Sequence, residues 1–439
     1  MKLLNKIKIL QGGYKITKIF IAGILVWSEE KSFLWRRVKI FGITLLSYRN
    51  KASRYKKEQI FEDLDNFIKF ANKQYSSSNK KSVLWLDHSL EGGAETYSFN
   101  QFSELESEYI FIRLQYDPLF DVYILSIPDK AVGYTSNFNT IKTFISKFNF
   151  FEICVNNLVG WIETLELLKL ISHYKENHSQ TKISFKGHDF HAICPSLNLL
   201  NCDKVFCNLT HQKGCSYCIK NITLDNNEQT NKILFNGFND IDTWRKSWND
   251  FFQNTLDEMI VFSNSTKDLF IRAYPVLKTK VRIIPHTTIQ LPVVEIKKHK
   301  DINIAILGNI SSIAKGYDVI EKMCKLNRDP HLNLIVIGTY KSPPRGLIVT
   351  GKYKPIDIPK LIKQYNIDIV FIPSISPETF SYTTSEAMNM NLPVACYNMG
   401  APAERVSKYK QGLVLKDINP LENLQEIKNF VKQLRKEIK

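Results

Sequence analysis

The segment from Ile367 to Tyr397 constrains the fold of this chain more than any other. It opens with Ile367–Pro373, a run that is apolar apart from one aspartate and is typical of a buried strand. A loop of small and polar residues follows, then a helix predicted from about Tyr382 to Met390, and Val394–Tyr397 starts the next strand. Free backbone N–H groups and the positive end of the helix dipole point at the loop. The segment therefore predicts an α/β fold with a phosphate site in this loop.

Two carboxylates, Glu378 and Glu386, lie in the same segment and are separated by seven residues. Glu378 belongs to the loop, and Glu386 belongs to the first turns of the helix. A carboxylate beside a phosphate site is best explained by a sugar, because it accepts hydrogen bonds from hydroxyls and leaves the phosphate to the backbone amides. The simpler alternative for Glu378 is that it caps the following helix.

Strands alternate with helical stretches in two successive parts of the chain. The first part begins at the apolar run Val83–Leu86 and ends at Val281–His286, and the second begins at Asn303 and includes Leu334–Gly338. Such alternation indicates parallel sheets, with ligands at the carboxyl ends of the strands and in the cleft between two domains. Further strands are expected at 109–114, 122–127, 151–155, 182–185, 259–263 and 347–350.

A chain of 439 residues is long enough for two domains and an appendage. We predict an N-terminal extension over 1–80, a first α/β domain over 81–290, a second α/β domain over 296–425 and a C-terminal helix over 421–439. Within the extension, the spacing of apolar residues predicts an amphipathic helix from Glu58 to Gln74.

The extension carries most of the positive charge of the chain. Residues 1–80 contain 17 Lys and Arg against 6 Asp and Glu, out of a net charge of +16 for the whole sequence. Its longest apolar run, Ile19–Trp27, has nine residues, about half of what a spanning helix needs. The mixture of basic and aromatic residues predicts peripheral contact with an anionic membrane surface. The alternative is a small β-rich or helical appendage packed on the main body, and no nucleic-acid-binding motif is present. The aromatic residues are Trp27, Phe33, Trp35 and Phe41.

The two glutamates resemble the E-x7-E motif of retaining GT-B glycosyltransferases, in particular those of family 4. Upstream, Ile304–Asn309 followed by Ala314–Asp318 resembles the strand, glycine turn and Lys-Gly-x-Asp segment of that family. Downstream, Gly400–Glu404 resembles its Gly-x-Pro-x-Glu loop, and the likeness extends over residues 83–435. The resemblance implies a GT-B fold of two Rossmann-like domains that face each other across a cleft. The domain over 81–290 would bind the acceptor, and the domain over 296–425 would bind the nucleotide-sugar donor.

The resemblance also implies roles for individual residues. His188 would face the donor sugar, Lys315 would neutralise the leaving diphosphate, and Glu378 would approach the donor sugar. The alternatives are that His188 has only a structural role and that Lys315 is a solvated lysine on the surface. Where the family has an arginine after the glycine turn, this chain has a neutral asparagine. The residues expected to bind the nucleotide sugar are Gly92, Gly93, Gly308, Asn309, Tyr353, Phe380, Ser381, Tyr382, Thr383 and Glu386.

Five of the eight cysteines fall within a short stretch. The spacing of Cys215 and Cys218 suits a metal, and Cys202 with Cys207 could complete a structural zinc site. Reduced thiols without a metal and disulfides are the alternatives, and a cytosolic location disfavours the disulfides.

We therefore expect a hexosyltransferase-type enzyme that moves a sugar from a nucleotide sugar to a surface glycan, lipopolysaccharide or lipid-linked oligosaccharide. Retention by a front-face mechanism is expected, with no cofactor or metal needed for the chemistry. It would work in the cytoplasm, on the inner face of a bacterial plasma membrane. The alternative is an inactive GT-B protein that acts as a membrane-associated scaffold, and a sugar-nucleotide epimerase is a third possibility.

Overall fold

The computed structural model describes the chain in two compact units. The described residues are 4–11, 14–32, 34–49, 55, 57–90, 92–210, 212, 214–222, 235, 238, 240–295 and 299–437. The first unit comprises Met1–Lys186, Asn236–Phe238 and Asp250–Glu258, and the second comprises Gly187–Phe235, Asn239–Asn249 and Met259–Lys439.

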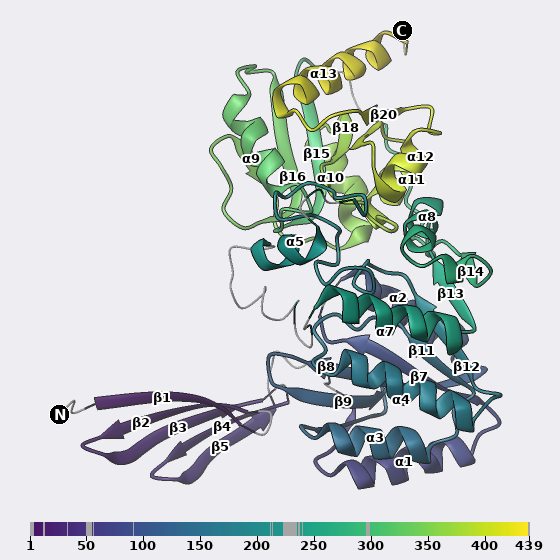
Figure 1. Cartoon of the computed structure of the whole chain (residues 1–439). Coiled ribbons are helices and arrows are strands. Elements are labelled where there is room, and N and C mark those ends of the chain that lie inside the picture. The colour runs from purple at the N-terminus through teal and green to yellow at the C-terminus, as the bar shows by residue number, and fades with distance from the viewer. Residues whose placement is uncertain are drawn as a thin grey trace. The chain divides into compact units, whose positions relative to one another are not determined.

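The first unit begins with an antiparallel sheet in which each strand pairs with the next along the chain (Figure 1). Leu34, in the turn between the third and fourth strands, is fully buried against Val122, Ile124 and Val132 of the same unit. The extension therefore contains a sheet that is anchored at one end. Its strands are β1 (Leu4–Gln11), β2 (Tyr14–Ile21), β3 (Ile24–Lys31), β4 (Trp35–Ile40) and β5 (Ile43–Arg49).

The main sheet of the first unit is mixed, not wholly parallel as the alternation of strands and helices predicted. Its strands lie in the order β12-β11-β7-β8-β9-β10-β6, and β9 runs antiparallel to both of its neighbours. The reason is the short connections at 118–121 and 128–130, because a parallel pair needs a crossover of about a dozen residues or more. The strands are β6 (Gln59–Phe61), β7 (Lys81–His88), β8 (Tyr109–Asp117), β9 (Val122–Ile127), β10 (Ala131–Thr135), β11 (Glu152–Val155) and β12 (Lys182–Lys186).

The helix expected from Glu58 to Gln74 starts later than predicted. Residues Gln59–Phe61 form strand β6 against β10, and the helix begins at Leu64 because the Asp63 side chain accepts a hydrogen bond from the Asp65 N–H. The helices of the first unit are α1 (Leu64–Ser76), α2 (Gly93–Leu105), α3 (Phe138–Lys147) and α4 (Thr164–Asn177).

The second unit contains a six-stranded sheet in which every pair is parallel, in the order β17-β16-β15-β18-β19-β20. Alternate residues of β15 enter two different hydrophobic clusters: Ile304 and Ile306 pack in one, Ala305 and Leu307 in the other. The sheet is therefore buried on both faces, as parallel sheets usually are. The strands are β15 (Ile302–Ile310), β16 (Leu332–Tyr340), β17 (Leu347–Val349), β18 (Ile369–Ile372), β19 (Val394–Tyr397) and β20 (Gly412–Leu415).

Helices connect these strands, and the last of them buries Leu424, Ile427 and Val431 along one stripe. They are α9 (Tyr317–Leu326), α10 (Ile358–Gln364), α11 (Tyr382–Asn389), α12 (Gly400–Val406) and α13 (Pro420–Glu437), with a 3-10 turn at Pro355–Asp357. The remaining elements are α5 (Cys215–Asn221), α7 (Ile241–Asn254), β13 (Glu258–Val261), α8 (Asn264–Ala273), a 3-10 turn at Pro275–Leu277, and β14 (Val281–Ile283).

Among the described residues, no helix combines the length and the apolar character that crossing a bilayer demands.

Candidate functional site

The loop between β18 and α11 holds Glu378 in a polar cradle. Lys315 Nζ lies 2.8 Å from Glu378 Oε1, and the Ser374 hydroxyl donates to the same oxygen. Burial acts to raise the pKa of Glu378. The Lys315 charge and the hydrogen bonds from Lys315, Ser374 and Ser381 outweigh it, so the pKa lies below its usual value. Glu378 is therefore an anion, and its cation partner is half exposed.

A glycine brings Lys315 to this loop. Gly316, just before α9, has a φ of +78°, and a Cβ there would lie 2.1 Å from the Pro373 carbonyl oxygen. The Ile375 N–H also donates to the Ala314 carbonyl at 3.0 Å. Only glycine permits such close backbone contact in this conformation. The Lys-Gly turn is thereby fixed against the end of β18, where the sequence predicted a phosphate-binding lysine.

Glu386 in α11 is buried, with 7% of its surface exposed, and its Oε2 atom has no hydrogen-bond partner. Burial raises the pKa of Glu386 to about 7. Burial also raises the pKa of Tyr353 and of Tyr382, and the Glu386 charge adds to both shifts. Tyr353 and Tyr382 therefore lie near Glu386, and the carboxylate of Glu386 has an oxygen that could accept a hydrogen bond from a ligand.

The predicted glycine turn is part of β15, and its Gly308 lies beside the start of α11. Gly308 has a φ of +105°, and a Cβ there would lie 3.7 Å from the Thr383 side chain. The next residue, Asn309, is exposed, and its Oδ1 accepts a hydrogen bond from the Thr339 hydroxyl at 2.8 Å. The place of the family arginine is thus held by a neutral amide that pairs with a neighbouring strand.

His188 lies against the residues that follow Glu378. Its carbonyl accepts a hydrogen bond from the Thr379 hydroxyl at 2.8 Å, and its ring is 5.4 Å from that of His286. His286 in turn stacks on Phe380 at 4.6 Å, and its Nδ1 is 2.5 Å from the Tyr382 hydroxyl. Burial and the Arg405 charge lower the pKa of His286 to about 3, so this ring is neutral.

Arg405 in α12 is a site residue that the sequence analysis missed. Its guanidinium donates to the Phe380 carbonyl, to the Ser381 carbonyl at 3.0 Å and to the Ser385 hydroxyl at 2.6 Å. It also lies 4.7 Å from the centre of the Phe380 ring, which is stacked on His286. Ser381 has a strained φ of +71° directly before α11. Arg405 therefore holds a strained loop in place, and its position directly after the Gly-x-Pro-x-Glu segment was the available signal.

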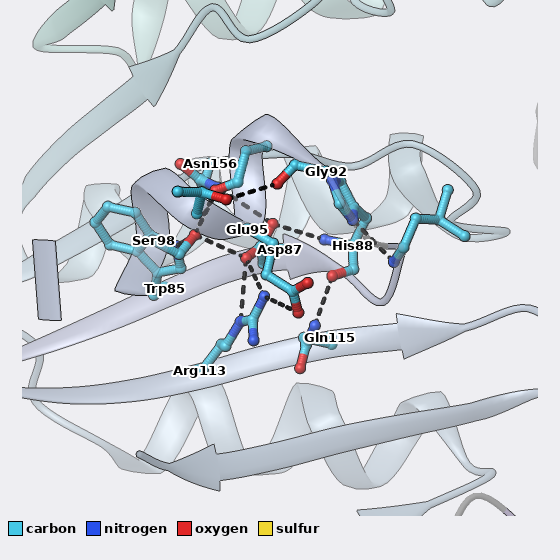
Figure 2. Close-up of polar contacts among 12 residues, drawn as sticks. Trp85, Asp87, His88, Gly92, Glu95, Ser98, Arg113, Gln115 and Asn156 are labelled. Carbon is cyan, nitrogen blue, oxygen red and sulfur yellow. Dashed lines mark hydrogen bonds and ion pairs between the residues drawn. The ribbon is translucent and has the colours of Figure 1, made fainter. Parts of the chain in front are cut away.

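Gly92 and Gly93 belong to the first unit, where they open α2 beside a second polar cluster. Figure 2 shows the side chains that surround Asp87 at the end of β7. Arg113 Nη2 lies 2.7 Å from Asp87 Oδ2, and the Ser98 hydroxyl and the Asn156 amide donate to the same carboxylate. Asp87 is fully buried and its acceptors are occupied, which is the arrangement of a structural ion pair.

The backbone around Gly92 depends on this cluster. The His88 N–H donates to Asp87 Oδ1 at 2.9 Å, and the His88 ring accepts the Leu90 N–H at 2.9 Å. Arg113 also lies 3.8 Å from Glu95 in the first turn of α2. Gly92 itself has a φ of +145°, which favours glycine. The cluster thus fixes both sides of the glycine pair.

The four predicted zinc ligands are not assembled into a site. In the part of the chain that the structure describes, no three His, Cys, Asp or Glu side chains lie close enough together to hold a metal. The Cys218 thiol accepts a hydrogen bond from the Cys202 N–H at 3.2 Å, and burial raises the pKa of the Cys207 and Cys218 thiols. The predicted zinc site, which included Cys215, is therefore not confirmed.

Residues 290–437 match the model of the family described as glycosyl transferases group 1. This match contains Lys315, Glu378 and Glu386 but none of the first unit. None of the curated proteins matches the sequence.

Solved structures match over most of the chain. Anabaena HepE in complex with UDP-glucose is similar with a TM-score of 0.51 and 13% identity, over 81% of this chain and 91% of HepE. A glycosyltransferase from Rickettsia africae ESF-5 is similar with a TM-score of 0.50 and 14% identity, over 81% of this chain and 89% of that one. At such identities the likeness shows the fold, and the predicted GT-B fold with two Rossmann-like domains is confirmed. Together with the family match, it supports a GT-B glycosyltransferase.

Proposed function

We propose that this protein is a retaining glycosyltransferase of family 4, which transfers a hexose from a nucleotide-diphosphate sugar to a glycan or lipid-linked acceptor. The observation that carries the proposal is the pair of carboxylates in α11 and in the loop that precedes it. Glu386 is buried with an unpartnered oxygen, and Glu378 is an anion held by a half-exposed lysine. A buried polar atom without a partner costs free energy, and a ligand that donates hydrogen bonds would remove that cost.

Each group has a task in this reaction. Glu386 would accept hydrogen bonds from the ribose hydroxyls, with Tyr353 beside the nucleobase. Lys315 would leave Glu378 for the diphosphate, and the N–H groups at the start of α11 would face the same oxygens. Glu378 would then be available to hydroxyls of the donor sugar, on the side where His188 lies. Arg405 would keep the loop in this shape during turnover.

The transfer itself needs charge stabilisation more than a nucleophile. The acceptor oxygen forms a bond to the anomeric carbon on the face that the diphosphate leaves, and the bond from that carbon to the diphosphate oxygen breaks. The departing phosphate oxygen takes the proton of the acceptor hydroxyl. Lys315 and the loop amides stabilise the charge that develops on the diphosphate, as preorganised donors do in other group transfers. We propose that this suffices without a metal ion.

The donor and the acceptor are proposed by class. A uridine nucleotide is the first candidate, because the similar Anabaena protein was solved with UDP-glucose. The domain over 296–425 would bind this donor, and the domain over 81–290, with Gly92 and Gly93, would bind the acceptor. A surface polysaccharide, lipopolysaccharide or lipid-linked oligosaccharide would suit an enzyme at the cytoplasmic face of a membrane. The scaffold alternative predicts that no donor binds at all.

The test is a screen of the purified full-length protein against UDP-, GDP-, dTDP- and ADP-sugars, with and without EDTA. Binding is measured by calorimetry, and slow hydrolysis is measured as nucleotide release. We expect one nucleotide to be bound and released at the same rate with EDTA. A rate that EDTA abolishes contradicts the metal-independent mechanism. Absence of binding to every donor contradicts the enzyme and favours the scaffold.

A further inference from the structure

The sheet β1–β5 exposes apolar side chains to an unusual degree. Strands β1 and β5 are exposed wherever their side chains are described, and Ile24, Phe41 and Ile43 have 64%, 65% and 68% of their surface exposed. An antiparallel sheet normally covers one face with a core. Contiguous exposed apolar surface of this kind marks a site of interaction.

The most exposed residues lie in two hairpin turns with nearly the same sequence. Ile21-Ala-Gly-Ile24 joins β2 to β3, and Ile40-Phe-Gly-Ile43 joins β4 to β5. In an antiparallel ladder of consecutive strands these two turns lie at the same end, as Figure 1 shows. Leu34 anchors the opposite end. The two apolar turns are therefore presented together, at the end away from the anchor.

The backbone of both turns is strained. Ala22 and Phe41 have φ values of +50° and +47°, and each is followed by a glycine with positive φ. Positive φ at both central residues defines the two-residue hairpin turn that normally selects Asn-Gly or Asp-Gly. A bulky phenylalanine is disfavoured in the left-handed region. Phe41 therefore does not stabilise this turn, and because it is exposed it adds little packing energy. Its presence is better explained by contact with a binding partner.

The strand register places the apolar residues and the lysines on one face. Ile21 pairs with Ile24, and Ile40 pairs with both Trp27 and Ile43, so all of them share a side of the sheet. On the same side, Lys6 pairs with Ile19 and Lys8 pairs with Thr17, farther along the sheet. This face therefore changes from apolar at the turns to basic toward the anchored end. The exposed cations on it include Lys6, Lys8, Lys15 and Lys31, while Arg36 on the same face is paired with Glu29.

We propose that the turn end of this sheet inserts into an anionic phospholipid bilayer. Ala22, Ile24, Phe41 and Ile43 would lie below the lipid headgroups, and the lysines would contact the headgroup phosphates. The proposal specifies how the membrane location suggested for the transferase would arise. An apolar tip bordered by cations matches the surface of such a bilayer, which has anionic headgroups above an apolar interior. A second copy of the chain would carry the same positive charge on this face, so like charges would repel.

The experiment is sedimentation of the full-length protein with vesicles of phosphatidylcholine, with and without phosphatidylglycerol. We expect binding to the anionic vesicles, and much weaker binding to phosphatidylcholine alone or in high salt, which screens surface charges. The Phe41→Asn variant should bind the anionic vesicles about tenfold more weakly, since it removes the largest apolar side chain among the four proposed to insert. Asparagine also suits the turn better than phenylalanine, so this variant should unfold at the same or a higher temperature.

A matched control separates the tip from exposed apolar residues in general. Ile356 has 62% of its surface exposed and lies in the second unit, so Ile356→Asn should bind vesicles like the unchanged protein. Equal binding of Phe41→Asn and the unchanged protein overturns the proposal, as does absence of binding to anionic vesicles. Self-association in solution that Phe41→Asn abolishes, without vesicle binding, would assign the tip to a second copy of the chain and overturn it as well. Hydrolysis of a soluble nucleotide sugar, measured without vesicles, tests the transferase separately.

Discussion

Asp87 in the first unit and Glu386 in the second are both buried carboxylates, but their surroundings differ. Asp87 is fully buried and bonded to Arg113, Ser98 and Asn156, so its charge is met inside the unit. Glu386 is buried with an oxygen that has no partner, and its pKa is raised to about 7. A buried charge whose partners are complete stabilises a fold, whereas an incomplete one is held ready for a ligand.

Glu378 lies between these extremes. It is ionised and paired, like Asp87, but its partner Lys315 is half exposed and belongs to a turn 63 residues away. Such a pair can open when a stronger anion arrives, while the Asp87 pair cannot open without exposing a buried guanidinium. The three carboxylates should therefore respond to mutation in three different ways.

The largest effect is expected at Asp87. Removing it in Asp87→Ala leaves Arg113 buried without its partner, which should lower the free energy of unfolding by about 3–5 kcal/mol. Urea denaturation followed by circular dichroism measures this loss. The double variant Asp87→Ala with Arg113→Met should recover part of it, because the unpaired charge is gone. A loss below about 1 kcal/mol would mean that the pair is not structural, and the contrast with Glu386 would disappear.

Lys315→Ala should affect turnover and leave stability nearly unchanged. Lysine supplies the charge that meets the leaving diphosphate, so donor hydrolysis should fall by about 10²–10³-fold. Its side chain is half exposed, and the free energy of unfolding should change by less than about 1 kcal/mol. Lys322→Ala, at an exposed lysine of α9, is the matched control and should hydrolyse the donor normally. Equal loss of activity in both variants would remove the special role of Lys315.

Glu386 should give the smallest effect, and one that depends on pH. Ionised Glu386 accepts the ribose hydrogen bonds, so donor affinity should rise as the pH increases through about 7. In Glu386→Gln the affinity should be lower above pH 7 and independent of this titration. Calorimetric titrations with the donor between pH 5.5 and 8.5 would measure how the affinity of each of the two proteins changes with pH. Parallel pH profiles for the two proteins would contradict the assignment of the titration to Glu386.

The same residue has an opposite effect on stability. Its pKa in the folded protein lies above the ordinary value of 4.5, so the folded state binds the proton more tightly than the unfolded state. The contribution of Glu386 to the stability of the folded state is fully present below pH 4.5 and is lost as the pH rises through about 7. Glutamine does not titrate, so Glu386→Gln keeps its stability as the pH rises. Its free energy of unfolding at pH 8 should exceed that of the unchanged protein by about 1–3 kcal/mol, and the difference should shrink toward pH 5.

Much of the second unit could be predicted because its signals are local. The apolar run Ile367–Pro373, the helix near Tyr382–Met390 and the strand Val394–Tyr397 all appear in the structure within a few residues. Errors arose where a neighbour in space decided the outcome. Gln59–Phe61 became a strand because β10 offers it a pairing edge, although its apolar spacing suits a helix. The β9–β10 hairpin was not expected, since its turn lacks the Asn-Gly signal.

Arg405 illustrates what motifs alone do not reveal. Its guanidinium holds the carbonyls of Phe380 and Ser381, more than twenty residues earlier in the chain. An arginine on a short helix gives no local sign of such a contact, because long side chains reach partners that only folding brings near. The cysteines show the reverse case: the spacing of Cys215 and Cys218 suggested a metal site, and the residues that the structure describes do not confirm it.

The sequence by itself determined the order of strand, loop and helix from Ile367 to Tyr397, and the glycines at 308 and 316 that let the backbone pass where a side chain would collide. These features depend on neighbouring residues and on local backbone conformation. The tertiary structure alone decided which carboxylate is paired and which is left open. Pairing depends on distances between groups such as Lys315 and Glu378, and a few ångströms there separate a structural ion pair from a site that can receive a ligand.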